Sequence, residues 1–209
     1  MFPESEAIRV MLISILNDEF AKVRYETPHL ERLFAIDPEL ETRWKQNTVI
    51  DLGDYTLEET DDWKDLLLIG TEVWGSCQSV YTDWNTNLSL VGFMFDGMHK
   101  AVVLRDKKTK RIVARYMTRL LYDRATNKPV FMTEKIYRAS PSPIIPQEFH
   151  DYPAQIISRC NIEKVSEASE DLLYIPHPMG IEGYVDSEIF KKEGAEEAAG
   201  EEFDLDELD

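Results

Sequence analysis

Residues 88–137, LSLVGFMFDGMHKAVVLRDKKTKRIVARYMTRLLYDRATNKPVFMTEKIY, give the clearest indication of the fold. It contains three strand-like segments, 101–104, 111–122 and 130–137, which are rich in apolar and β-branched residues and are separated by short polar turns. A parallel crossover needs about a dozen residues, so turns this short indicate antiparallel neighbours. The stretch therefore predicts a three-stranded, or larger, β-meander.

The segment just before the first strand predicts a buried helix. Residues 88–96 are apolar on nearly every side and end at Asp96-Gly97, and either Asn85 or Asn87 can cap the start. A helix that is apolar all round belongs in a core, and glycine is the usual residue just past a helix end. We expect this helix to pack on one face of the meander.

The N-terminal part predicts a layer of helices. Apolar residues recur at three- and four-residue spacing over 4–24, and we interpret this stripe as core-facing because the opposite side is not enriched in Lys and Arg, as a membrane-surface helix would be. Pro28 and Pro38, each preceded by a capping residue, predict helices over 28–35 and 38–46. The fold class is therefore α+β.

The segment between these helices and the meander is acidic and mixed. Residues 47–65 predict a connecting loop, with one strand option at 48–52, and they lack the ligand spacing of a calcium loop. Residues 66–69 fit a short buried strand or the end of a helix.

The C-terminal part is broken by prolines. A short helix is predicted at 153–160 and an edge strand at 171–175, and residues from about 188 onward have the composition of a disordered tail. We predict a single domain over 1–187, followed by an acidic tail over 188–209. The domain divides into helical residues 4–46, the helix and meander at 66–138, and a proline-rich extension at 139–187.

The charge of the chain limits its partners. The 40 acidic residues outnumber the 23 basic ones, giving a formal net charge of −17, and nine carboxylates follow residue 192 with no basic residue among them. Residues 1–192 therefore carry −8. Because nucleic-acid affinity comes mainly from Lys and Arg, an acidic chain is not expected to bind nucleic acid, and a basic protein surface is its natural complement.

The cysteines and the hydropathy pattern favour a soluble cytoplasmic protein. Cys77 and Cys160 are too few for a disulfide framework, no segment resembles a secretory signal, and no run reaches the ~18 apolar residues of a membrane span. Export by a route that needs no classical signal stays open. The sequence predicts no metal site and no cofactor.

Cys77 is the first candidate for chemistry. It lies in the turn Gly75-Ser76-Cys77-Gln78, ahead of the predicted helix and sheet, which is the chain order of papain-like and transglutaminase-like thiol enzymes. In this hypothesis Cys77 is the nucleophile, His99 or His150 the base, and Gln78 with nearby amides the oxyanion donors. The predicted strands 111–122 and 129–137 contain no histidine, and the alternative is a buried structural thiol.

The arginines of the second predicted strand are the next candidate. Arg111, Arg115 and Arg119 share one face, and Glu134 on the neighbouring strand is placed to pair with them. Such a row can bind a phosphate or carboxylate ligand. It can also be the solvated side of a half-buried sheet.

The acidic tail is the third candidate. Phe203, Leu205 and Leu208 alternate with carboxylates, a pattern that disordered segments use to dock onto basic, grooved partners. The alternative is an end that only adds solubility.

A set of short motifs resembles a known kind of domain. The matching residues are Gly70-Thr71, Gly75-Ser76-Cys77-Gln78, Asn87, Asp96-Gly97, Ile112-Val113-Ala114-Arg115, Arg119-Leu120-Leu121 and Glu134-Lys135-Ile136-Tyr137. Together they are similar to a cysteine-containing domain in large uncharacterised proteins of intracellular bacteria, some of them effector-like, and they span about a third of the chain. The resemblance implies a host-directed function and no particular catalytic role.

Taken together, these features favour an intracellular protein that binds a basic protein partner through its acidic surface and tail. It would work in a bacterial cytoplasm or, as an effector, in a host cytosol. The alternative is a cysteine-dependent hydrolase, deamidase or acyl transferase with Cys77 as nucleophile.

Overall fold

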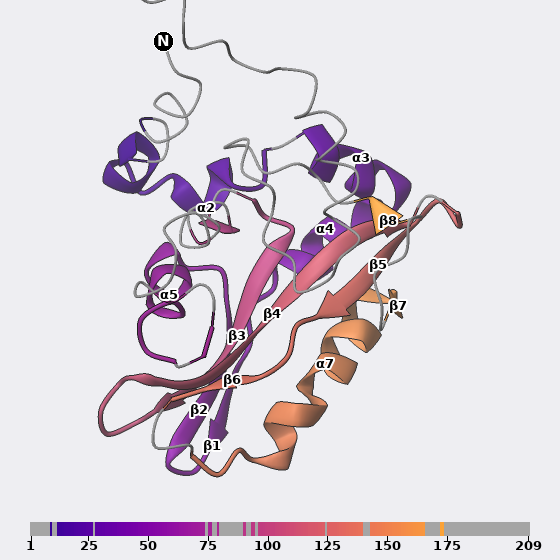
Figure 1. Cartoon of the computed structure of the whole chain (residues 1–209). Helices are drawn as coiled ribbons and strands as arrows, with labels where there is room; N and C mark the ends of the chain where they lie inside the picture. Colours follow the sequence, from indigo (N-terminus) through magenta and orange to yellow (C-terminus); the bar gives the residue numbers. More distant parts are fainter. Residues whose placement is uncertain are drawn as a thin grey trace, which may run out of the picture.

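The computed structural model describes residues 9, 12–26, 28–73, 75–76, 79, 90, 93–94, 96–123, 125–139, 143–165 and 172–173. In this part of the chain, helices lie against a mixed eight-stranded sheet, which is an α+β fold (Figure 1). The elements are α2 (Phe20–Val23), α3 (Pro28–Ile36), α4 (Pro38–Lys45), β1 (Val49–Leu52), β2 (Tyr55–Thr60), α5 (Trp63–Leu68), β3 (His99–Asp106), β4 (Ile112–Asp123), β5 (Lys128–Thr133), β6 (Tyr137–Arg138), α7 (Gln147–Cys160), β7 (Glu163–Lys164) and β8 (Leu172–Leu173).

The predicted meander is confirmed as the centre of a larger sheet. The strand order is β1-β2-β3-β4-β5-β7, with every pair antiparallel except β5 and β7. The long strand β4 has β3 and β8 on one side and β5 and β6 on the other. Short turns thus build most of the sheet, as the sequence indicated.

The interpretation of residues 47–65 as a connecting loop is wrong. The strand option at 48–52 corresponds to β1, and the following residues form β2, which pairs with β3 along its whole length. The charged residues of β2 made the segment look like a loop. Its Glu59 is nevertheless buried in the core, because Lys100 and Arg159, which are distant in sequence, neutralise it. The next segment, 66–69, is the end of helix α5.

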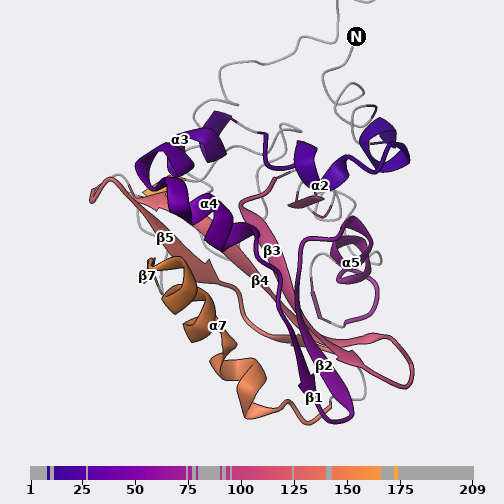
Figure 2. The ribbon, with the colours of Figure 1, turned by 180° about the vertical axis from the view of Figure 1, so that it is seen from behind.

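Two hydrophobic cores lie on the two faces of the sheet. Helices α3, α4 and α7 cover the first face (Figure 2), and α2, α5 and the segment before β3 contribute to the second. The first core includes Leu30, Leu40, Trp44, Val102, Leu104, Tyr116, Phe131, Phe149 and Ile156. The second includes Phe20, Leu66, Leu90, Phe93, Met94, Ala101, Val103 and Met117.

The helix predicted over 88–96 lies largely outside the described residues. Leu90, Phe93 and Met94 are helical, buried and part of the second core, in agreement with a helix packed on the meander. Gly97 follows it in a position that requires glycine, since a Cβ there would lie 2.5 Å from the Tyr25 ring and 2.9 Å from the Arg24 carbonyl oxygen.

The predicted continuous helix over 4–24 is wrong within the described part. Residues 12–16 are helical, Asp18 has a φ of 59°, and α2 begins only at Phe20. The break divides the apolar stripe, so Phe20 is buried while Leu12 and Leu16 are 51% and 84% exposed. Asp tolerates this left-handed conformation better than most residues.

Helix α7 is longer than the predicted 153–160, because Pro153 lies inside it rather than near its start. Proline lacks the N–H that would bond the carbonyl four residues earlier, which is that of Phe149. The Tyr116 hydroxyl donates to this carbonyl at 3.4 Å. A residue from the sheet thus replaces the missing helix bond.

The predicted disordered tail lies outside the described residues.

Candidate functional site

The second face of the sheet brings several of the predicted site residues together. His99 is the first residue of β3 and pairs with Arg119 of β4. Arg115 lies on the same side of β4, and Glu134 follows β5, where its backbone N–H donates to the Met117 carbonyl at 2.9 Å. We call His99, Arg115, Arg119 and Glu134 the second-face cluster.

One carboxylate lies between two guanidinium groups in this cluster. Arg115 Nη1 lies 3.3 Å from Glu134 Oε2, and Arg119 Nη2 donates to Glu134 Oε1. Both arginine side chains are 0% exposed and that of Glu134 is 2% exposed. The predicted pairing with Glu134 is therefore confirmed for Arg115 and Arg119, and the solvated-face alternative is wrong for these two, because the second core covers them. Arg111 instead has a 65% exposed side chain and lies 3.4 Å from Glu72.

Aromatic rings surround the buried arginines. The Arg115 guanidinium lies 4.2 Å from the centre of the Tyr137 ring, and that of Arg119 lies 5.5 Å from the centre of the Phe93 ring. A cation over a ring face gains about 2 kcal/mol when it is desolvated. These contacts help to offset the cost of burying two positive charges.

His99 is a buried imidazole. Its ring lies 4.8 Å from that of Phe93, and Nδ1 is 3.2 Å from Asp96 Oδ2, although neither ring nitrogen has a hydrogen bond within the described residues. Burial lowers the pKa of His99 because it disfavours the imidazolium, and Arg119 adds to this effect while Asp96 opposes it. His99 thus has the neighbouring carboxylate that orients a base in many catalytic sites.

Ser76 connects the cluster to the turn that contains the candidate thiol. Its Oγ accepts a hydrogen bond of 2.6 Å from Arg115 Nη2, and the residue is buried. Cys77 and Gln78 lie outside the described residues, so their roles stay predictions. His150 is exposed on α7, the helix that covers the opposite face of the sheet. Phe203, Leu205 and Leu208 also lie outside the described part.

Arg24 is a structural residue that the sequence did not indicate. Its Nη1 donates to the Asp61 carbonyl at 2.6 Å, and its Nη2 donates to the carbonyls of Phe93, Asp96 and His99 at 3.1, 3.0 and 2.6 Å. This one guanidinium fixes the backbone that precedes β3 and thereby positions Asp96 and His99. An isolated Arg at a helix end gives no sequence signal for such a role.

A second buried ionic network, on the first face, was also missed. Glu59 accepts from Lys100 Nζ at 2.7 Å, from Tyr152 Oη at 2.8 Å and from Arg159 Nη2 at 2.8 and 2.9 Å. Lys100 Nζ donates further to the carbonyls of Trp44 and Gln46 at 3.0 and 2.7 Å. We call Glu59, Lys100, Tyr152 and Arg159 the first-face network. It joins β2, β3, α4 and α7.

The acidic residues near β1 and β2 are largely neutralised by the basic strands. Arg105 binds Glu58 at 2.9 Å and Asp65 at 2.6 Å. Similar ion pairs join Lys107 to Asp51 at 2.5 Å and Arg111 to Glu72 at 3.4 Å. Over the whole chain, residues 1–165 contain 25 acidic and 21 basic residues, whereas residues 166–209 contain 15 and 2. Most of the net charge thus comes from the C-terminal segment.

The described residues contain neither a cluster of metal ligands nor a membrane-spanning helix. Within them, no group of three or more His, Cys, Asp or Glu side chains is placed to hold a metal ion. No helix in the same part of the chain is both long enough and apolar enough to cross a membrane.

The comparisons with known proteins do not identify the chain. It matches no protein-family model and no curated protein. Among solved structures it is similar to a ribosomal-protein-alanine N-acetyltransferase from Brucella melitensis biovar Abortus 2308, at 13% identity and a TM-score of 0.42. The match covers 55% of this chain and 80% of that one. A similarity this weak assigns no activity to this chain.

Proposed function

We propose that this chain is a protein-binding protein that engages a basic partner through residues 193–209, the end of its acidic C-terminal segment 166–209. The observation that carries this proposal is the distribution of charge. Acidic residues around β1 and β2 are paired with Arg and Lys of the meander, so they are poor candidates for holding a partner. Residues 166–209 hold 15 acidic residues against 2 basic ones.

The end of this segment has the composition of a docking motif. Phe203, Leu205 and Leu208 provide apolar side chains among the carboxylates. Charge accelerates and steers the encounter, whereas apolar anchors give most of the stability of a bound complex. The sequence alone predicted binding through both an acidic surface and the tail, and the proposal now assigns binding to the C-terminal segment only. A cytoplasmic location, or a host cytosol for an effector-like protein, is part of the same proposal.

Partner capture with three forms of the chain tests this function. The immobilised full chain, the chain lacking residues 193–209, and a variant with Phe203, Leu205 and Leu208 changed to Ala are incubated with a cell extract. The Ala variant keeps all nine carboxylates and is the matched control for simple charge attraction. We expect the partner to be lost with the truncation, weakened at least tenfold with the Ala variant, and released as salt rises. Equal capture by the truncated chain would contradict the proposal.

The second candidate function is a thiol enzyme, favoured by the contact between His99 Nδ1 and Asp96 Oδ2. In this proposal the Cys77 sulfur attacks a carbonyl carbon, and His99 takes the thiol proton and returns it to the leaving group. The deep burial of His99 weakens it as a base, which is why protein binding ranks first.

Alkylation by iodoacetamide tests the thiol-enzyme proposal. Cys160 is the internal control, since it is buried and desolvation raises the pKa of its thiol. If Cys77 is a nucleophile, we expect it to react at least tenfold faster than Cys160 in the native chain at pH 7, and His99→Gln to reduce that rate. Equal rates for the two thiols would eliminate an enzyme that uses Cys77.

A further inference from the structure

Strand β1 forms an open edge of the sheet. It stands at one end of the strand order, and within the described residues β2 is its only strand partner. Arg159 of α7 donates to the Thr48 hydroxyl at 3.2 Å, just before the strand, but Val49 is 69% exposed and the Asp51 side chain is 75% exposed. β1 also lacks the lysine, proline or bulge with which many proteins protect an edge strand. The edge can therefore accept a further strand.

The register of the β1–β2 pair shows which backbone groups point outward. The Glu59 N–H donates to the Thr48 carbonyl at 2.8 Å. Because hydrogen-bonded pairs alternate along an antiparallel ladder, Ile50 also directs its backbone groups towards β2. The N–H and C=O groups of Val49 and Asp51 therefore point away from β2. Within the described residues, these four groups have no hydrogen-bond partner.

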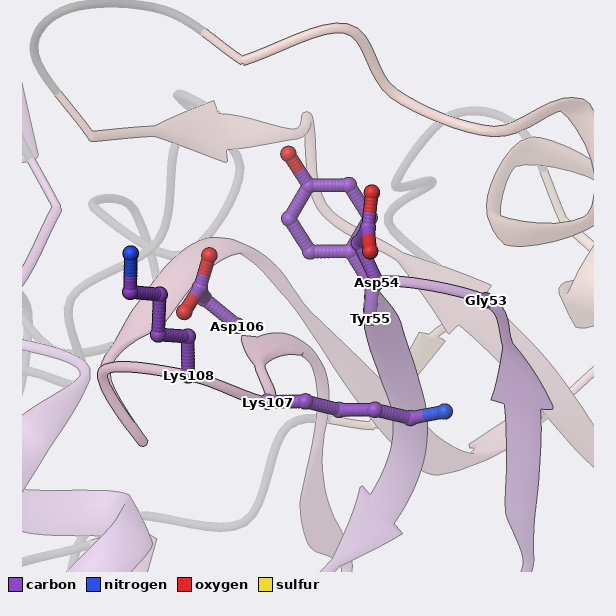
Figure 3. Close-up of a pocket in the computed structure, with 6 residues that line it drawn as sticks. All are labelled: Gly53, Asp54, Tyr55, Asp106, Lys107 and Lys108. Atoms are coloured by element: carbon purple, nitrogen blue, oxygen red, sulfur yellow. The ribbon is translucent and has the colours of Figure 1, made fainter.

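The side chains of β1 alternate between the two faces of the sheet. Ile50 and Leu52 pack against the first core. Val49 and Asp51 therefore lie on the opposite side of the strand. Lys107 forms an ion pair of 2.5 Å with Asp51, and Figure 3 shows its side chain extending across β2 from the β3–β4 turn towards β1. The exposed carboxylate thus brings little uncompensated charge to the edge.

We propose that β1 pairs antiparallel with β1 of a second copy of the chain, about a two-fold axis at Ile50. In this register Val49 faces Asp51 of the second copy. Each of the two such pairs exchanges two hydrogen bonds, which satisfies all the outward groups of both strands. Ile50 lies opposite its own counterpart on the first face, where the two apolar side chains pack together. The inference goes beyond the proposed function, because the contact uses no part of residues 193–209.

The sequence of β1 disfavours the other registers. A slip of one residue would bring the inward-pointing groups of Ile50 to the contact. A slip of two residues in one direction sets Asp51 directly opposite Asp51 of the second copy, and like charges in this position are destabilising. The reverse slip pairs Asp51 with Asn47, which lies outside the strand and donates its side chain to Asp61 at 2.7 Å. β1 is thus complementary to itself in one register, which favours a second copy over an unrelated strand.

Hydrogen exchange followed by NMR at rising chain concentration tests the pairing. Four backbone hydrogen bonds and a few side chains make a weak contact, so we expect dimers to form between about 0.1 and 1 mM. The Val49 and Asp51 amides should gain protection as dimers form. The Ile50 amide, which is bonded to β2, is the internal control and should be protected at every concentration. Exchange at Val49 and Asp51 that does not change up to about 1 mM would overturn the proposal.

Two variants at Val49 test the contact by sedimentation equilibrium. Val49→Pro removes an N–H that the fold does not use, and proline is tolerated at the first residue of an edge strand whose N–H faces solvent. We expect V49P to weaken dimerisation at least tenfold, because it removes two of the four hydrogen bonds and places a ring at the contact. Val49→Thr keeps the N–H and the branched side chain, and it should change the affinity less than about twofold. Equal dimerisation of V49P and V49T would reject the pairing, and the exchange experiment on the natural chain decides the question independently of how V49P folds.

Salt dependence separates this proposal from the proposed function. Two copies of a chain with a net charge of −17 repel each other, and salt screens this repulsion. We therefore expect dimerisation to strengthen several-fold between about 50 and 500 mM NaCl, whereas capture of a basic partner weakens. Dimers that dissociate as salt rises would be held by charge and would overturn the β1 pairing. Deletion of residues 193–209 should abolish partner capture and keep the dimer. Capture that survives this deletion would reject only the function, and loss of the dimer would reject only the pairing.

Discussion

The two faces of the sheet bury similar charges in different ways. On the first face, Glu59 accepts four hydrogen bonds, and Lys100 donates all three of its protons to Glu59 and two helix-end carbonyls. On the second face, Glu134 contacts two arginines, and the adjacent His99 has no hydrogen bond to its ring nitrogens within the described residues. The Glu59 carboxylate and the Lys100 ammonium are thus fully hydrogen-bonded, as a structural clamp requires, and within the described residues only Arg159 Nε of this network has no partner. A histidine without such bonds retains the capacity for proton transfer or binding.

The two groups of charged residues also differ in how far apart their members lie in the sequence. The first-face network joins residues that are far apart in sequence, from Glu59 to Arg159. The second-face cluster is built mostly within the meander, where register alone brings the side chains together. Long-range ion pairs form only once the whole domain has folded, so the first face depends most on the complete tertiary structure.

The largest effect is expected from Glu59→Gln. This isosteric change removes the negative charge that neutralises Lys100 and Arg159 and turns one acceptor into a donor. Uncompensated buried charges cost about 3–5 kcal/mol, so we expect the free energy of unfolding to fall by that amount in urea titrations. Glu58→Gln is the matched control, because the neighbouring side chain points away from this core and its pair with Arg105 is partly exposed. It should cost about 1 kcal/mol or less.

Glu134→Gln should have a smaller effect on the second face. The amide oxygen can still accept from one arginine, and Arg115 also donates to Ser76. We expect a loss of about 2–3 kcal/mol in the same urea titrations. If the free energy of unfolding fell as much as it does for Glu59→Gln, the two faces would not differ, and both would act as structural clamps. A loss below 1 kcal/mol would sharpen the difference, by showing that the arginines do not need this carboxylate for folding.

The meander was predictable from the sequence because local rules decide it. Short polar turns fix antiparallel pairing, and the parity of β4 places Arg115 and Arg119 on one face. Strand β2 was missed for the opposite reason. In the sequence its Glu58 and Glu59 resemble loop residues. Only the folded structure brings Arg105 to Glu58, and Lys100 and Arg159 to Glu59.

The candidate site was predictable only in part. Pattern alone gave the pairing of the arginines with Glu134, but not their burial, because the covering side chains, such as Phe93, come from another segment. Parity cannot tell which face of a sheet will be covered. The role of Arg24 in fixing the backbone before β3 could not be predicted from the sequence either. The acceptors of these hydrogen bonds are backbone carbonyls, which every sequence provides.

The smallest of the expected effects is the pH dependence that His99 gives to stability. Its folded pKa lies below the ordinary value near 6.5, so the unfolded chain binds a proton that the folded chain excludes. The contribution of neutral His99 is therefore present above about pH 6.5 and is lost as the pH falls through the folded pKa. One proton gives a slope of at most about 1.4 kcal/mol per pH unit. Urea midpoints measured between pH 7.5 and 5 should fall more steeply for the natural chain than for His99→Gln. Equal slopes would mean that the imidazole is solvated or already protonated in the folded state. The second face would then lack the buried neutral base that sets it apart from the first.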